Sequence, residues 1–256
     1  MPIFDFIPTG QIGDPTWELA RNFPGALPAC YCAGLIWGPR MSRYGGCIRI
    51  SREWILTAHH VIDIAALAPR LSARFGYVGP SKNSFDYELD VGNGGFFPSL
   101  DGILGPSGDT FGLDYVFIRL KPPYPENDPS LSNLPKPTRA TSIPNLTRAI
   151  IPHHRGRRFM QIPEEHSVEE RHIGTVAGSD HSYLYYLSTT EKGGSGSPIF
   201  DGDWNLLGLH THSYNSSLPS VDYRKKHNWG TRITEIIEDA RQRGFDLTQI
   251  PVLDSL

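Results

Sequence analysis

The sequence has 256 residues and a mass of 28.5 kDa, enough to bury a substantial core in one large domain or two packed units. Hydrophobic residues make up 39% and charged residues 20%, which excludes a disordered chain, while 26 Gly and 22 Pro favour the many short, turn-bounded elements of all-β proteins. The net charge of -3 excludes a general polyanion binder, because binding phosphates needs clustered positive charge.

The N-terminal stretch and the cysteines predict a compartment. The segment MPIFDFIPTGQIGD has neither a basic start nor an apolar run long enough for a signal peptide or a membrane span. Cys30, Cys32 and Cys47 are odd in number and lack the repeat spacing of metal ligands. Cys30 and Cys32 would share one face of a strand as small core residues. We therefore expect no structural disulfide, no membrane association and a cytoplasmic location.

Short β-type runs, bounded by Gly, Pro, Ser or Asn, fill the first half of the chain. They lie at residues 29–37, 46–50, 54–58, 71–78, 85–90 and 115–120. Between Lys121 and Pro137 there are six prolines in 17 residues, too many for a helix or a central strand, so this segment predicts a linker.

A second set of β-type runs follows, at residues 148–152, 158–162, 182–188, 197–200 and 205–212. The apolar period then becomes helical at four residues, Ile233, Ile236, Ile237 and Ala240. Thr231 is a candidate N-cap and Gly244 a candidate stop, so we predict a helix over 232–243 whose Ile face packs on the second β unit.

The stretch EKGGSGSPIF, residues 191–200, places Ser195 among glycines just before an apolar strand. Gly and Ser are common in turns, so the run is compatible with a plain connection between strands. The functional alternative is a tight loop that exposes a nucleophilic hydroxyl and leaves backbone N–H groups free for an oxyanion. That alternative requires a histidine and a carboxylate elsewhere in the chain.

Both partners occur earlier in the chain. The run WILTAHHVID ends a β-type segment in two histidines, and Asp114 opens the apolar strand of GLDYVFIRL. Taken singly, each is an ordinary surface, core or turn residue. Their occurrence in the order His, Asp, Ser, with a linker before the serine, favours nucleophilic catalysis.

These motifs resemble those of serine peptidases with the chymotrypsin fold, and most of all the bacterial glutamyl endopeptidases of the V8 type. The resemblance rests on ILTAHHV, LDYVFIRL and YYLSTTEKGGSGSPIF and spans roughly residues 28 to 243. It implies an all-β fold with two antiparallel β-barrels of the chymotrypsin type, a C-terminal α-helix and an active site between the barrels.

The predicted organisation has five parts. They are an N-terminal extension (1–27), a first β-barrel with His60 and Asp114 (28–120), a Pro-rich linker (121–144), a second β-barrel with Ser195 and the substrate pocket (145–232), and the C-terminal helix and tail (233–256).

The resemblance also implies catalytic roles. Ser195 attacks the scissile carbonyl, His60 removes its proton and then protonates the leaving amine, and Asp114 orients the imidazole. The backbone N–H groups of Gly193 and Ser195 form the oxyanion hole. The family spacing from Thr57 selects His60 over His59, and neighbouring residues of an extended segment point in opposite directions.

The same resemblance predicts a substrate pocket. V8-type enzymes contact an acidic side chain through a histidine 15 residues after the nucleophile and a threonine five before it, positions that are His210 and Thr190 here. An imidazole and a hydroxyl donate hydrogen bonds to a carboxylate or to a neutral amide, so Glu is favoured while Gln and Asp stay open. Ser213 would add a third donor. Glu191 and Lys192 replace smaller residues at the pocket rim.

Two further interpretations of the histidine-rich segments stay open. His210 and His212 share a strand face by chance or form a metal pair, the first being the preferred interpretation, so no metal or other cofactor is predicted. The segment HHRGRR, residues 153–158, is interpreted as a solvated loop, and no nucleic-acid partner is expected.

The predicted function is a serine endopeptidase that acts on protein or peptide substrates. The alternative is a two-barrel binding module, or a latent protease whose oxyanion loop stays inactive until an activating protein partner docks.

Overall fold

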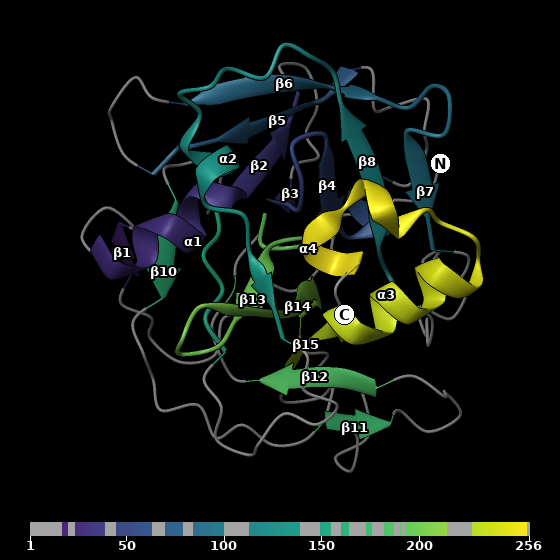
Figure 1. Cartoon of the computed structure of the whole chain (residues 1–256). Helices are drawn as coiled ribbons and strands as arrows, with labels where there is room; N and C mark the ends of the chain where they lie inside the picture. Colours follow the sequence, from purple (N-terminus) through teal and green to yellow (C-terminus); the bar gives the residue numbers. More distant parts are fainter. Residues whose placement is uncertain are drawn as a thin grey trace, which may run out of the picture.

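The computed structural model describes residues 17–19, 24–38, 45–62, 70–78, 84–99, 113–138, 149–154, 160–163, 173–175, 182–186, 190, 193–213 and 227–254. These residues form two β units, one above the other in Figure 1, with the C-terminal helical segments at their side. The prediction of an all-β fold with two antiparallel barrels and a C-terminal helix is confirmed.

The first β unit is a closed antiparallel barrel. Its ring runs β4-β3-β2-β5-β6-β8 and closes where β8 pairs with β4. On its other edge, β8 pairs with β7 near its start and with β6 near its end. The strands are β2 (Ala33–Trp37), β3 (Gly45–Arg49), β4 (Trp54–Thr57), β5 (Ser72–Phe75), β6 (Phe85–Asp90), β7 (Phe96–Pro98) and β8 (Val116–Leu120). Alternate side chains of these strands, such as Ile55, Phe75 and Ile118, fill the interior.

The second β unit has the strand order β11-β12-β15-β14-β13. Its strands are β11 (Ile173–Thr175), β12 (Ser182–Tyr186), β13 (Pro198–Phe200), β14 (Asn205–His212) and β15 (Asn228–Arg232). All of these neighbours pair antiparallel, and β9 (Lys136–Pro137) adds a short parallel pair to β14. The central strand β15 was not predicted, because its sequence NWGTR shows no apolar alternation.

The C-terminal helix α3 (Ile233–Gln242) begins one residue later than predicted and is followed by Gly244 at φ 81°, the stop that the sequence indicated. Arg232 is at the N-cap position in place of Thr231, and no side chain caps the helix.

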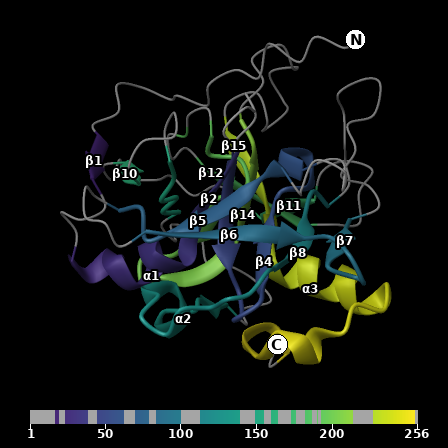
Figure 2. The same cartoon turned by 90° about the horizontal axis from the view of Figure 1, so that it is seen from above.

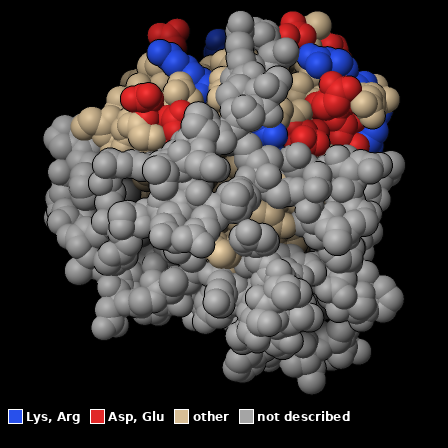
Figure 3. Space-filling model, turned by 90° about the horizontal axis from the view of Figure 1, so that it is seen from below, with Lys and Arg blue, Asp and Glu red and all other residues tan. Residues whose placement is uncertain are grey.

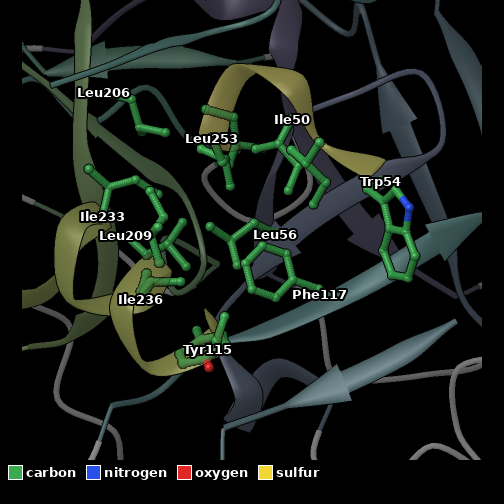
Figure 4. Packing of buried hydrophobic residues seen from close by; sticks show 14 of the residues in the cluster. Ile50, Trp54, Leu56, Tyr115, Phe117, Leu206, Leu209, Ile233, Ile236 and Leu253 are labelled. Carbon is green, nitrogen blue, oxygen red and sulfur yellow. The ribbon is translucent and has the colours of Figure 1, made fainter. Parts of the chain in front are cut away.

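The helix α3 packs on the second unit, as predicted, and also on the first barrel. Its buried face shares one cluster with Leu56 and Phe117 of the first barrel and with Leu206 and Leu209 of β14 (Figure 4). Leu253 of α4 (Pro251–Asp254), which follows η7 (Leu247–Gln249), completes that cluster beside Ile50. The C-terminal segment therefore joins the two barrels.

The segment around Cys30 is helical, which corrects the prediction of a strand over 29–37. The helix α1 (Leu27–Cys32) follows η2 (Pro24–Ala26) and carries Pro28 in its first turn, where a missing N–H costs nothing. Cys30 and Cys32 lie in different clusters, Cys30 with Val78 and Met160 and Cys32 in the core shared by the barrels. They therefore do not share one face.

The predicted linker contains short ordered elements, α2 (Pro129–Ser132) and β9, and is anchored in the first barrel. Asp128 caps α2 and also binds Arg49 of β3, with 2.7 Å between Nη1 and Oδ2 and both side chains fully buried. The hydroxyl of Tyr87 donates to the same carboxylate. Removing either partner would leave the other as an unpaired buried charge, which is strongly unfavourable. This ion pair therefore holds the linker against the barrel wall.

Two peripheral features complete the fold. Near the N-terminus, β1 (Trp17–Leu19) pairs antiparallel with β10 (Gln161–Pro163), and both lie at the edge of the molecule in Figure 2.

Figure 3 shows acidic and basic side chains of described residues intermingled on one rim. No helix in the described part of the chain has the length and hydropathy required to cross a bilayer.

Candidate active site

His60 and Asp114 are brought together by the first barrel. His60 lies in η3 (His59–Ile62), directly after β4, and Asp114 precedes β8, which pairs with β4. The Nδ1 atom of His60 is 2.5 Å from Oδ2 of Asp114, and the backbone N–H of His60 donates to Oδ1 at 3.1 Å. The carboxylate therefore fixes both the ring and the backbone of His60.

The two adjacent histidines have different surroundings. The side chain of His60 is 20% exposed beside Asp114, whereas His59 is buried and meets the ring of Phe96 edge-on, with centroids 6.5 Å apart. The carboxylate contact therefore favours His60 over its neighbour as the residue that faces the serine.

The electrostatics of Asp114 suit a permanent carboxylate. Burial alone would raise its pKa, but the charge of His60 and the hydrogen bonds from His60 outweigh burial and hold the pKa below its ordinary value. Asp114 is thus ionised at neutral pH and can stabilise a positive imidazole.

The loop that carries Ser195 is held between the barrels by backbone hydrogen bonds. The N–H of Gly46 on β3 donates to the carbonyl of Ser195 at 2.7 Å. On the other side, Gly196 N–H donates to the carbonyl of His210 at 2.7 Å, and His210 N–H donates to the carbonyl of Ser197 at 2.8 Å. Ser195 is therefore fixed between one strand of each barrel.

Two glycines permit this close approach. A Cβ at Gly46 would lie 2.0 Å from Oγ of Ser197, and one at Gly196 would lie 2.2 Å from Oγ1 of Thr57 and 3.1 Å from the nitrogen of Ala58. Ala58 lies two residues before His60, so the same contact brings the serine loop to the histidine segment.

The oxyanion candidates lie on the same turn. Gly193 has φ 102°, a left-handed conformation that favours glycine, and Ser197 N–H closes the turn onto the carbonyl of Gly194 at 2.9 Å. Ser195 is half-buried at the tip of this turn.

The predicted pocket residues have buried partners. Nδ1 of His210 is 2.6 Å from the hydroxyl of Tyr186 on β12, and Oγ1 of Thr190 accepts from Nδ2 of Asn228 on β15 at 3.3 Å. Sequence reasoning missed both partners. Tyr186 carries the clearer signal, since it follows Leu184 by two on a strand and so shares a core-facing position where a hydroxyl needs a partner.

His210 is neutral in this environment. Burial, above all, and then the charges that His153, His212 and His60 can carry, hold the pKa of its imidazole well below the ordinary value. An uncharged ring can still donate one hydrogen bond to a substrate.

His210 and His212 have different surroundings, because a bulge in β14 lies between them. His212 stacks on Trp229 with ring centroids 4.1 Å apart, and its ring is 5.7 Å from that of His60. Ser213, half-buried, follows the end of β14.

The described residues contain no group of three or more His, Cys, Asp or Glu that could hold a metal ion. Glu191 and Lys192, at the predicted pocket rim, lie outside the described residues, as do residues 155–158 of the basic segment.

The fold and this constellation define a two-barrel protein with a Ser, His and Asp at the junction of its barrels. The sequence model of the trypsin-like peptidase domain matches residues 45–209, so the chain belongs to that family. No curated protein sequence matches the chain.

Solved structures confirm the fold. A Glu endopeptidase in complex with MPD superposes with a TM-score of 0.61 at 17% identity, over 92% of this chain and 99% of that one. The Rv3671c protease of M. tuberculosis, in an inactive form, gives 0.53 at 14% identity over 91% and 98%. A serine endoprotease from Yersinia pestis gives 0.56 at 12% identity over 86% of this chain and 65% of that one.

Proposed function

We propose that the protein is a serine endopeptidase in which Ser195, His60 and Asp114 act as a catalytic triad. The observation that carries this proposal is the 2.5 Å contact between His60 and Asp114 next to the backbone-anchored Ser195 loop. A carboxylate on Nδ1 places the imidazole lone pair on Nε2, where it can accept the serine proton.

The reaction follows from these groups. The oxygen of Ser195 attacks the peptide carbonyl while its proton passes to His60, and the backbone N–H groups of Gly193 and Ser195 stabilise the oxyanion. His60 then protonates the leaving amine. To release the acyl group, His60 takes a proton from water as the water oxygen attacks the acyl carbon, and then returns that proton to the oxygen of Ser195 as the acid product leaves.

We propose that the peptide is cut after a residue whose side chain ends in a hydrogen-bond acceptor: Glu, or else Gln or Asp. His210 and Thr190 are the supporting residues, because both are buried and each bears a polar hydrogen, and the backbone of His210 hydrogen-bonds to the serine loop. Ser213 is proposed as a third contact.

We further propose a cytoplasmic location and a protein partner that controls activity. All three cysteines are reduced and buried, and burial raises the pKa of the Cys32 thiol to about 12, which keeps it unreactive and suits a reducing compartment. An endopeptidase in that compartment needs restraint, which a partner would supply.

Labelling with a fluorophosphonate probe tests the triad. We expect the wild type to be labelled and Ser195→Ala to be unlabelled. Ser197→Ala is the matched control, because it removes a buried hydroxyl from the same loop and leaves the nucleophile in place. An unlabelled wild type, alone and with candidate partners, would contradict the proposal. Tight partner binding that survives Ser195→Ala would then favour the binding module.

A further inference from the structure

A single buried hydroxyl lies where the strand that leads to His60 meets the serine loop. It belongs to Thr57, which ends β4 three residues before His60 and pairs with Val116, two residues after Asp114. The side chain of Thr57 is fully buried. Thr57 is therefore the β4 residue nearest along the strands to both His60 and Asp114.

The hydroxyl of Thr57 is connected to the serine loop through one residue of β3. Oγ1 of Thr57 donates to the carbonyl of Gly46 at 2.7 Å, and the N–H of Gly46 donates to the carbonyl of Ser195, also at 2.7 Å. Gly46 thus has its carbonyl bound to β4 and its N–H bound to the loop. The place of the loop relative to His60 therefore depends on this hydroxyl.

The same hydroxyl packs directly against the loop. A Cβ at Gly196 would lie 2.2 Å from Oγ1 of Thr57 and 2.4 Å from the carbonyl oxygen of Gly46. The residue that follows Ser195 therefore rests on the hydrogen-bonded pair that Thr57 and Gly46 form. A larger separation between these two oxygen atoms would displace Gly196 as well.

We propose that Thr57 is a positioning residue whose hydroxyl, acting through Gly46, sets the distance between Ser195 and His60. This rests on the proposed endopeptidase function. Because Thr57 is fully buried, it acts on the reaction only through its neighbours. A methyl group in place of Oγ1 would need about 3.3 Å or more to the carbonyl oxygen of Gly46, against 2.7 Å for the hydroxyl, so the carbonyl and the loop would have to move.

Three substitutions at Thr57 separate the hydrogen bond from the shape of the side chain. Thr57→Val keeps the shape and loses the hydrogen bond, and we expect kcat to fall about tenfold to hundredfold with KM within about twofold. Thr57→Ser keeps the hydroxyl and loses the methyl group, so kcat should stay within about threefold of the wild type. If Thr57→Val fails to fold, Thr57→Ala takes its place, because it differs from Thr57→Ser by one oxygen atom.

Thr231→Val is the matched control. Thr231, on β15, is also fully buried, and its hydroxyl has no hydrogen-bond partner among the described residues. The same substitution there removes a hydroxyl without removing a hydrogen bond, so kcat should stay within about twofold. A fall in kcat equal to that of Thr57→Val would show that the effect is not specific to Thr57 and would overturn the proposal.

Amide hydrogen exchange gives a readout that does not depend on turnover. In Ser195→Ala, the N–H of Gly46 should be protected, because it donates to the backbone carbonyl of residue 195. Adding Thr57→Val should speed its exchange about fivefold or more, which is the contribution of one hydrogen bond. Adding Thr57→Ser should leave its exchange unchanged.

The results separate two kinds of failure. Unchanged kcat in folded Thr57→Val, or a Thr57→Ser protein as impaired as Thr57→Val, would overturn the role of the hydroxyl while leaving the peptidase intact. Unchanged exchange at Gly46 would do the same. No cleavage of any peptide, together with no fluorophosphonate labelling, would instead count against the endopeptidase itself, and the exchange data would still decide whether Thr57 places the loop.

Discussion

His60 and His210 lie on opposite sides of the serine loop and show how one side chain type serves two purposes. His60 is partly exposed and has a buried carboxylate on Nδ1, whereas His210 is buried and has a phenol there. Asp114 stabilises a positive charge on His60, while burial, and then the surrounding imidazoles, oppose a positive charge on His210.

The two rings therefore lie in surroundings that favour opposite charge states. His60, which we propose carries a proton during the reaction, has a negative neighbour, and His210, which we propose contacts the substrate side chain, has a neutral one. Four predictions separate these two environments, and they are arranged from the largest expected effect to the smallest.

Asp114→Asn should abolish the first environment. Without the negative charge, the imidazole of His60 loses its orientation and its support when protonated, and we expect kcat to fall about 10⁴-fold. Turnover of the best peptide measures this. The residual activity should keep the wild-type preference among peptides with Glu, Gln or Asp before the cut, since the proposed His210 pocket is untouched, and a changed preference would show that the two sites are not separable.

Gly46→Ala should move the serine loop away from the first barrel. The added Cβ would lie 2.0 Å from Oγ of Ser197 and 2.7 Å from its backbone, so the loop must shift. A displacement on the order of 1 Å lowers kcat about 10²-fold. Gly25→Ala is the control, because a Cβ there meets nothing within 4 Å. Unchanged kcat would show that the loop is not positioned by β3.

His210 should make the protein less stable in mild acid. Its folded pKa is below the unfolded value of about 6.5, so the unfolded chain takes up this proton first, and stability is lost as the pH falls below that value. One such group contributes up to about 1.4 kcal/mol per pH unit. Asp114 has its folded pKa lowered, so its contribution is lost only below about pH 4.

Thermal unfolding of Ser195→Ala between pH 7.5 and 5, compared with the same protein carrying His210→Gln, measures this difference. The added substitution should flatten the loss of Tm. Identical slopes would mean that the pKa of His210 is the same in the folded and the unfolded protein.

Tyr115→Phe should have the smallest effect. The hydroxyl of Tyr115 donates to Asp239 on α3, and its loss should lower the free energy of unfolding by about 1 kcal/mol. The backbone of Tyr115 is also held by Ser99 on both its N–H and its carbonyl, so Asp114 should keep its place and kcat should stay within about twofold. A tenfold fall in kcat would show that α3 positions the carboxylate.

The sequence could indicate the local features of the site. Glycines around Ser195, two histidines after a β-type run and an aspartate before an apolar strand are each visible in a short window. The structure gives Gly193 and Gly196 the positive φ values that such a loop requires.

The contacts between distant segments were not visible. From the sequence, Tyr186 is indistinguishable from the other apolar residues of its strand, and only the fold brings it to His210. Asn228 belongs to a strand without apolar alternation. The helix α1 was mistaken for a strand because six residues are too few for a helical period to emerge.

The core that α3 and α4 share with the first barrel has a consequence for synthesis. The cluster around Leu56 and Phe117 needs Ile236 and Leu253, so a growing chain that ends before residue 233 leaves this apolar surface open to water. Ser195, His60 and Asp114, the residues proposed for catalysis, are all translated by then, whereas the segment that packs against both barrels is not.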